Sequence, residues 1–211
     1  MIKLYHCPDA RSFRCLWLLE ELQLPYELAM LQFPPRLKSP EFLQINPCGT
    51  VPWMTDGEAV MFESAAALEY LTGAYGVGEL AVPSETADRA AWLNWLHFGE
   101  ASMTMPLATM MRYTYFEPPE RRQPQVVADC RDIYLSRVAM VDSALQGRDY
   151  LVGNRFSAAD ISVGYALLLS RMLKLQDDYS DTIKAYWERL RQRPAYKAAK
   201  HAQSAQDSAV S

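Results

Sequence analysis

Residues 45–52 read Ile-Asn-Pro-Cys-Gly-Thr-Val-Pro and residues 63–64 read Glu-Ser, and this part of the chain decides the fold. Pro52 has no backbone N–H, so it belongs at the start or the edge of a strand. An Asp-Gly pair then separates two short apolar runs, 51–55 and 59–62, as is typical of a tight hairpin. The Glu-Ser pair opens a helical pattern, so the order strand, strand, helix is predicted.

The residues before this segment predict a strand, a helix and a second strand. Residues 2–5 form a short apolar run, and residues 12–22 place apolar side chains at helical spacing. Residues 26–31 follow a proline and read as the next strand, which gives a βαβ unit with a right-handed crossover. With a short helix over residues 40–45, we expect an α/β domain of βαβ-α-ββα order over residues 1–78.

Strand patterns disappear after about residue 87, and an all-α domain is expected over residues 85–205. Long amphipathic stretches cover residues 87–111, 123–145, 158–174 and 180–192. Residues 76–84 contain glycine and proline and are interpreted as a linker. The small polar residues 202–211 are expected to fray.

A helix start is predicted at residues 157–160, which read Ser-Ala-Ala-Asp. Ser157 can accept a hydrogen bond from the first turn and Asp160 can reach back, which is a capping box with the shorter acid. Phe156 and Ile161 stand at the two positions of a hydrophobic staple.

The composition is that of a folded, weakly acidic protein. The chain has 211 residues, a net charge of −4, 50% hydrophobic residues and 22% charged residues. This balance argues against disorder and gives no basic footprint for nucleic acid. The absence of a long apolar segment or signal-like N-terminus favours a cytoplasmic protein with no membrane span and free thiols. The cysteine and histidine spacing gives no zinc motif, so no metal is expected.

Two pairs of residues suit a peptide ligand. A cis bond at Val51-Pro52 would turn the chain and present the Val51 backbone to an extended peptide, although taken alone the pair is better explained by an ordinary turn proline. At Glu63-Ser64, the helix N-terminus attracts a carboxylate and Glu63 can accept an ammonium group. A capped helix beside an exposed acid is the alternative.

Together these motifs resemble the glutathione S-transferase superfamily, specifically the bacterial-type cytosolic enzymes, over nearly the whole chain. The resemblance rests on the N-P-x-G-x-V-P run, the Glu-Ser pair at its spacing and the capping box. It implies a thioredoxin-like first domain, a helical substrate-binding domain, a homodimer and a role in detoxification. It also implies glutathione as co-substrate, with a small hydrophobic electrophile as second substrate.

The resemblance assigns six residues to glutathione. Pro52 would be the cis proline and Val51 the backbone partner of the cysteinyl residue. Glu63 and Ser64 would hold the γ-glutamyl end. Lys38 would face the glycine carboxylate, and Asn94 would reach glutathione across the dimer interface.

The catalytic assignment falls on the loop after the first strand, residues 7–14. By alignment with family members Asp9 occupies a catalytic serine position, and an ionised carboxylate cannot donate to a thiolate. Ser12 is therefore predicted to stabilise the thiolate, with positive charge from Arg11, unless it only caps the helix.

Two other functions stay open. Cys7-Pro8 resembles the start of sites where a cysteine forms a mixed disulfide with glutathione, so a Cys7-dependent thiol transferase or deglutathionylating enzyme is one alternative. A non-catalytic glutathione-binding protein of the same fold is the other. For the conjugating enzyme, methionine and aromatic residues within 103–116 are candidates for an adaptable apolar pocket.

Overall fold

The computed structural model describes residues 1–76 and 80–207, which form two compact units. The first unit is Met1–Ala81 with Arg191–Ser211, and the second is Val82–Leu190. The sequence predicted domains of residues 1–78 and 85–205. The main difference between these domains and the two units is that the C-terminal segment from Arg191 groups with the first unit. The last helix packs on the first unit and belongs to it.

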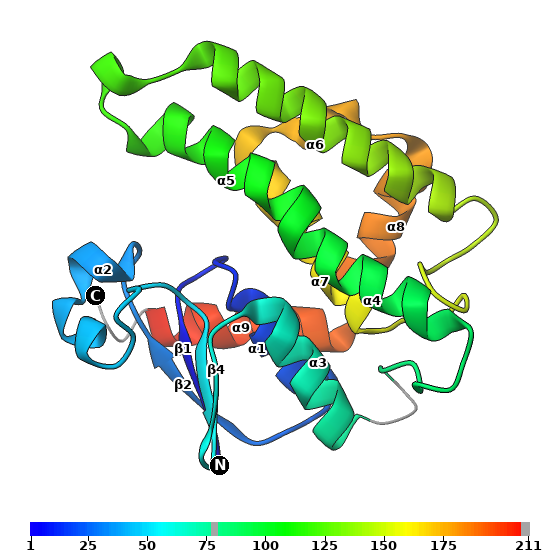
Figure 1. The fold of residues 1–211 in the computed structure, drawn as a ribbon, viewed down its shortest axis with the longest axis horizontal. Coiled ribbons are helices and arrows are strands. Elements are labelled where there is room, and N and C mark those ends of the chain that lie inside the picture. Colours follow the sequence, from blue (N-terminus) through cyan, green and yellow to red (C-terminus); the bar gives the residue numbers. More distant parts are fainter. Residues whose placement is uncertain (77–79, 208–211) are drawn as a thin grey trace. The chain divides into compact units, whose positions relative to one another are not determined.

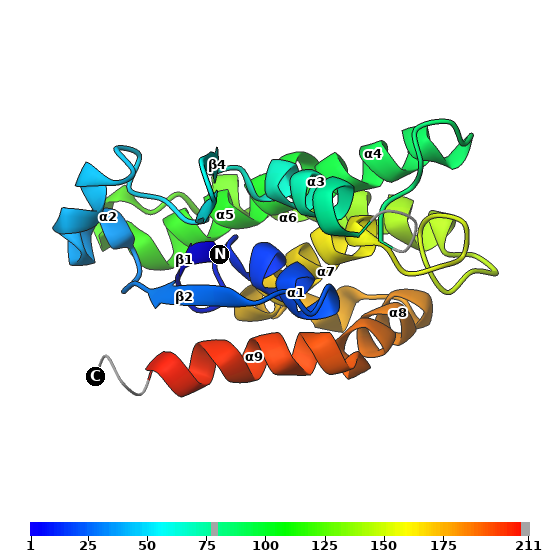
Figure 2. The same cartoon turned by 90° about the horizontal axis from the view of Figure 1, so that it is seen from below.

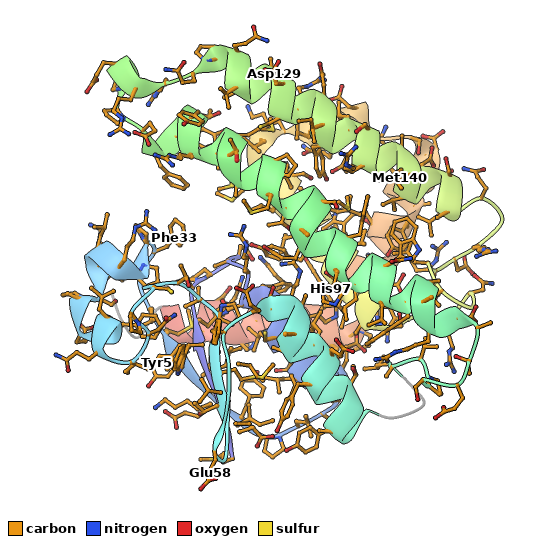
Figure 3. All side chains as sticks on the ribbon, viewed as in Figure 1. Tyr5, Phe33, Glu58, His97, Asp129 and Met140 are labelled. Carbon is orange, nitrogen blue, oxygen red and sulfur yellow. The ribbon has the colours of Figure 1, made fainter. Side chains whose placement is uncertain are left out.

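The first unit is built on a four-stranded mixed sheet in the order β2-β1-β3-β4 (Figure 1). Its strands are β1 (Ile2–His6), β2 (Tyr26–Met30), β3 (Trp53–Asp56) and β4 (Ala59–Met61). β1 pairs with β2 in parallel and with β3 antiparallel, and β3 pairs antiparallel with β4. Glu58 marks the tip of the β3–β4 hairpin (Figure 3). The predicted βαβ and ββ connections are confirmed.

Two helices of the first unit pack on each other beside the sheet. They are α1 (Phe13–Glu21) and α3 (Ser64–Tyr75). The fully buried side chains of this unit come from both helices and the sheet, and they include Leu16, Leu19, Leu68 and Leu71 of the helices and Leu4 and Met54 of the strands. Between β2 and β3 lie a short helix α2 (Pro35–Lys38), which was not predicted, and a 3₁₀ helix η1 (Pro40–Gln44).

The C-terminal helix α9 (Pro194–Asp207) runs alongside α1 in the first unit (Figure 2). The ring of Tyr196 packs edge-on against Phe13 and Trp17, with centroids 5.6 and 5.0 Å away. The expected fraying from residue 202 is therefore wrong up to Asp207, because tertiary packing orders this small, polar helix. Residues 208–211 lie outside the described part of the chain, as do residues 77–79 of the predicted linker.

The second unit is mainly helical, as expected. Its elements are α4 (Asp88–Phe98), the π-helical η2 (Gly99–Thr104), α5 (Met105–Met111), the π-helical η3 (Arg112–Phe116), η4 (Pro119–Arg121), α6 (Pro124–Ala144), α7 (Ala158–Ser170), η5 (Arg171–Leu173), η6 (Leu175–Asp178) and α8 (Asp181–Gln192). Every residue of α7 is buried. Gly99 lets the backbone at the end of α4 approach α7, since a Cβ there would lie 2.5 Å from the backbone carbonyl carbon of Ser162.

The predicted capping box at the start of α7 is confirmed. The hydroxyl of Ser157 accepts from the first-turn N–H of Ala159, and the Ser157 N–H donates to Asp160 at 2.9 Å. Asp160 also accepts from the Leu151 N–H and the Tyr186 hydroxyl. Burial nevertheless raises the pKa of Asp160 to about 6, since a buried carboxylate loses hydration.

Candidate functional site

Val51 and Pro52 lie directly before β3, and the peptide bond between them is cis. The β1–β3 ladder ends at the Tyr5–Trp53 pair, so Val51 stands beyond the paired residues. The buried side chain of Val51 packs in a cluster with Cys7 and Phe42, with Ala10 packed against it. The loop after β1 and the segment before β3 are thus neighbours, as a common peptide site requires.

Glu63 and Ser64 lie at the N-terminus of the 12-residue helix α3. Glu63 is the exposed N-cap residue in an extended conformation, and Ser64 is the first helical residue, so the cap falls one residue before the predicted serine. The first backbone N–H groups of a helix have no partner within it, and they attract anions. This end of α3 can therefore receive a carboxylate.

A buried arginine supports this end of α3. Arg14 of α1 is fully buried, and its Nη1 donates to Ser64 Oγ at 3.2 Å. A hydroxyl has two acceptor lone pairs and one proton, so Ser64 keeps its own proton for another acceptor. A guanidinium stays charged at all ordinary pH values, and it adds positive potential behind the site. Arg14 was missed because it lies within an apolar helical run.

The side chain of Ser12 is fully buried and already hydrogen-bonded. Ser12 Oγ lies 2.8 Å from Nδ1 of His6, and the Cys7 N–H points to the same oxygen at 3.4 Å. On the other side of the ring, His6 Nε2 lies 3.0 Å from Gln203 Oε1. The amide NH₂ of Gln203 donates to Asp9 at 2.8 Å, which fixes Oε1 as an acceptor.

These contacts determine the direction of each hydrogen bond. Because Gln203 Oε1 can only accept, His6 Nε2 carries the proton of the neutral ring, and Nδ1 is an acceptor. Ser12 therefore donates its single proton to His6. Direct donation from Ser12 to a thiolate would require this hydroxyl to leave His6, and the predicted role of Ser12 stays a prediction. Its hydroxyl does not cap α1 either.

Burial lowers the pKa of His6 to about 4, because the charged imidazolium would lose its hydration inside the protein. The chain of hydrogen bonds through Ser12 and Gln203 consequently operates with a neutral imidazole at physiological pH.

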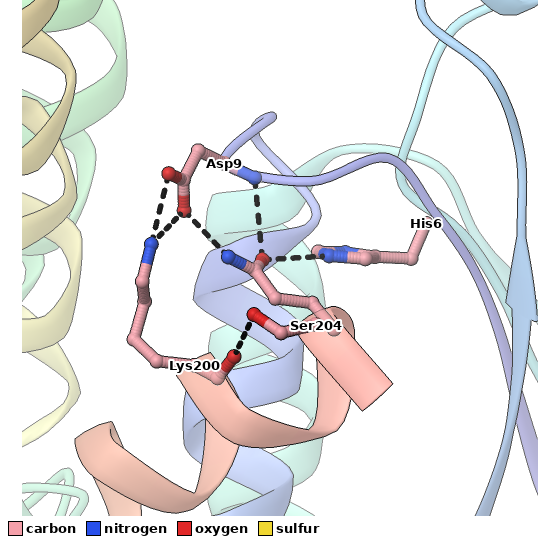
Figure 4. Close-up of polar contacts among 5 residues, drawn as sticks. His6, Asp9, Lys200 and Ser204 are labelled. Carbon is pink, nitrogen blue, oxygen red and sulfur yellow. Dashed lines mark hydrogen bonds and ion pairs between the residues drawn. The ribbon is translucent and has the colours of Figure 1, made fainter. Parts of the chain in front are cut away.

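Asp9 anchors the middle of the loop to α9 (Figure 4). Its carboxylate accepts two short contacts from Lys200 Nζ, at 2.7 and 2.8 Å. Its backbone N–H donates to Gln203 Oε1 at 3.2 Å, and its φ of 52° lies in the left-handed region. Few non-glycine residues adopt that region, so the side chain and backbone contacts together specify this conformation.

The other loop residues differ in their access to solvent. Arg11 is half-buried in the loop, two residues before α1, and its guanidinium is positively charged. Cys7 is fully buried, and burial raises the pKa of its thiol to about 12. The thiolate is the reactive form of cysteine, so this position does not favour a Cys7 nucleophile.

Two predicted binding residues are exposed on helices. Lys38 lies in the last turn of α2 and belongs to the same unit as Val51 and Ser64. Asn94 is exposed on α4 in the second unit. His97, which also projects from α4, is shown in Figure 3.

Six of the seven predicted apolar pocket residues divide into two groups, and the seventh, Tyr113, is partly buried. Met103, Met110 and Met111 are buried and serve packing, whereas Met105, Tyr115 and Phe116 are exposed. The exposed three are half open, with relative exposures of 52%, 50% and 55%. These three expose apolar surface to solvent.

Residues His6, Lys200 and Gln203 were missed as well as Arg14. Alternate residues of β1 are buried, and His6 lies on the same face as Ile2 and Leu4. A buried, hydrogen-bonded histidine could therefore have been predicted from the sequence. Within residues 1–76 and 80–207, no group of three acidic, cysteine or histidine side chains has the geometry to hold a metal ion. None of the helices in that part of the chain is long and apolar enough to span a membrane.

Comparison with known proteins gives the same assignment along both units. The family model for the glutathione S-transferase N-terminal domain matches residues 1–73, and that for the C-terminal domain matches residues 104–194. A probable glutathione S-transferase GSTF1 of Oryza sativa is 30% identical, with 87% of this chain and 88% of that protein covered.

Solved structures are similar over nearly the whole chain. A glutathione transferase from Methylococcus capsulatus superposes with a TM-score of 0.86 at 27% identity, covering 97% of this chain and 99% of that one. A sphingomonad glutathione S-transferase complexed with glutathione gives 0.83 at 26% identity, covering 96% and 98%.

The fold and the matched domains define a two-domain transferase with a thioredoxin-like first unit. The chain belongs to the glutathione S-transferase family.

Proposed function

We propose that the chain binds glutathione on its first unit and conjugates the thiol to an electrophilic, apolar small molecule. The observation that carries this proposal is the pairing of the Val51-Pro52 segment with the Glu63-Ser64 helix start on one sheet-and-helix unit. The related sphingomonad transferase, whose structure holds glutathione, supports the choice of ligand.

The tripeptide would be held by complementary groups along its length. The backbone of Val51, beyond the end of the β1–β3 ladder, would pair with the cysteinyl residue as an added strand. The γ-glutamyl carboxylate would accept from the start of α3 and from Ser64, while Glu63 receives the ammonium group. Lys38 would attract the glycine carboxylate by charge.

The thiol would lie over the loop of residues 7–12 and the first turn of α1. Positive charge from Arg11 and the N-terminus of this nine-residue helix favours the thiolate. The thiol proton leaves to solvent, the sulfur forms a bond to the electrophilic carbon, and the leaving group departs with its bonding electrons. Ser12 contributes a direct hydrogen bond only if its hydroxyl turns away from His6.

The second substrate and the assembly follow from the same proposal. Met105, Tyr115 and Phe116 offer the apolar surface on which the electrophile would lie. We assign a homodimer in which Asn94 of one copy reaches glutathione bound to the other. Conjugation of apolar electrophiles fits a cytoplasmic detoxification role, with no nucleic-acid or membrane partner and no metal.

The two alternatives make different predictions. A Cys7-dependent thiol transferase needs a reactive thiolate, which the raised pKa of the buried Cys7 disfavours. A binding protein without catalysis would hold glutathione without lowering its thiol pKa.

The test combines conjugation and binding measurements. The wild-type protein should conjugate glutathione to a chlorinated nitroaromatic, and Ser64→Ala should weaken glutathione binding by roughly tenfold, the effect of losing about 1.4 kcal/mol. The matched control is Ser136→Ala, which removes an exposed hydroxyl that donates to a carbonyl of its own helix. Cys7→Ser should keep its activity. Glutathione binding without turnover would refute conjugation, and equal binding by the Ser64 and Ser136 variants would refute the site.

A further inference from the structure

The C-terminal helix α9 contacts the loop after β1 through two side chains. Gln203, only 3% exposed, joins the His6 ring and the backbone N–H of Asp9 on its oxygen side, and the Asp9 carboxylate on its nitrogen side. One turn earlier, Lys200 forms the two-oxygen ion pair with Asp9 (Figure 4). The contacts link positions more than 190 residues apart in sequence.

We propose that α9 is a working part of the glutathione site: Lys200 and Gln203 are positioning residues that fix the 7–12 loop and neutralise the Asp9 carboxylate. This inference rests on the proposed function, because it assumes that the glutathione thiol lies over that loop.

Asp9 places a carboxylate in the loop of residues 7–12. A carboxylate in the loop that receives a thiolate opposes ionisation of the thiol, since two like charges in one site repel. Lys200 places a cation against both carboxylate oxygens, so the pair presents little net charge to the loop. Without Lys200, more of the negative charge of Asp9 would act on the bound thiol.

Helix α9 also holds the backbone of the 7–12 loop at Asp9. Asp9 holds a left-handed conformation between β1 and α1, and its N–H donates to Gln203 Oε1 on α9. Gln203 thereby fixes the loop at its turning point, and through His6 it also fixes Ser12. Helix α9 thus determines which donors the loop presents.

Four other ionisable side chains lie in or beside the loop. His6 is neutral at physiological pH, and the buried Cys7 thiol is un-ionised. Arg11 remains cationic on the loop itself, and Arg14 lies beneath Ser64. Among these groups Asp9 is the acidic one, and Lys200 is its cationic partner on α9.

The experiment is a double-mutant cycle at Asp9 and Lys200 in the full-length protein. The thiol pKa of bound glutathione is measured from the ultraviolet absorbance of its thiolate. Lys200→Met should raise this pKa by roughly half a unit to one unit, the effect of removing one positive charge about 8 Å away in a partly solvated site. Asp9→Asn combined with Lys200→Met should return it toward the wild-type value, and Lys200→Arg should leave it there.

The matched control removes a different cation from the same end of the chain. Arg193 forms a two-point ion pair with Glu21, at 2.6 and 2.8 Å, just before α9 begins. Arg193→Met should lower the unfolding midpoint and leave the thiol pKa unchanged. If Lys200→Met and Arg193→Met behave alike, or if the double variant is not restored, α9 is only structural and the inference is overturned. Failure of the wild-type protein to bind glutathione would instead overturn the proposed function.

Discussion

Acidification from about pH 7 to about pH 5 should destabilise the protein through one buried side chain, His6. Its ring is fully buried between Ser12 and Gln203, and burial lowers its pKa from 6.5 to about 4. Between pH 7 and pH 5 the unfolded chain therefore binds a proton at His6 that the folded chain does not bind. Stability from His6 is present above about pH 6.5 and is lost as the pH falls toward 4.

The magnitude follows from the two pKa values. Each unit of difference corresponds to about 1.4 kcal/mol, and the proton linkage between pH 7 and pH 5 amounts to about 2 kcal/mol of unfolding free energy. Asp160 acts in the opposite direction, because its raised pKa makes its contribution fall as the pH rises. A comparison of the wild-type protein with a His6 variant cancels the Asp160 contribution.

The assay is urea unfolding at fixed protein concentration, at several pH values, for the wild type and for His6→Gln. Glutamine cannot titrate, so the variant should lose about 2 kcal/mol less than the wild type between pH 7 and pH 5. An equal pH dependence of the unfolding free energy in the two proteins would show that His6 binds its proton in the folded state as readily as in the unfolded state. Burial would then not lower its pKa.

Three further substitutions test packing. Gly99→Ala places a Cβ 2.5 Å from the Ser162 backbone and should lower the free energy of unfolding by about 1–3 kcal/mol. Gly73→Ala lies on an exposed face of α3, where the new Cβ meets no neighbouring group within 4 Å, and should raise the free energy of unfolding by roughly 0.5–1 kcal/mol. Thermal unfolding that ranks the two variants the other way contradicts the close approach of Gly99 to α7. Tyr196→Ala removes a ring packed on Phe13 and Trp17 and should cost about 3 kcal/mol, and an unchanged unfolding midpoint would show that α9 does not dock there.

Local pattern was sufficient for most of the fold. The strands of the first unit, the helix after Glu63 and the capping box at Ser157 depend on neighbours within a few residues, and each is confirmed. The cis bond before Pro52, which the family resemblance implied, is also present.

What the sequence could not predict depends on distant partners. Helix α9 is rich in small and polar residues, and it is ordered by packing of Tyr196 on α1. The orientation of the Ser12 hydroxyl depends on His6, which depends in turn on Gln203, 197 residues away from it. The buried Arg14 is recognisable only once α1 and α3 are placed side by side.

A crystal structure of the protein with glutathione tests the central claim most directly. We expect the cysteinyl residue to pair with the backbone of Val51, and the γ-glutamyl carboxylate to lie within about 3.2 Å of Ser64 and the start of α3. The sulfur should lie over the loop of residues 7–12. Glutathione bound elsewhere, or its γ-glutamyl end away from Glu63 and Ser64, would contradict the account.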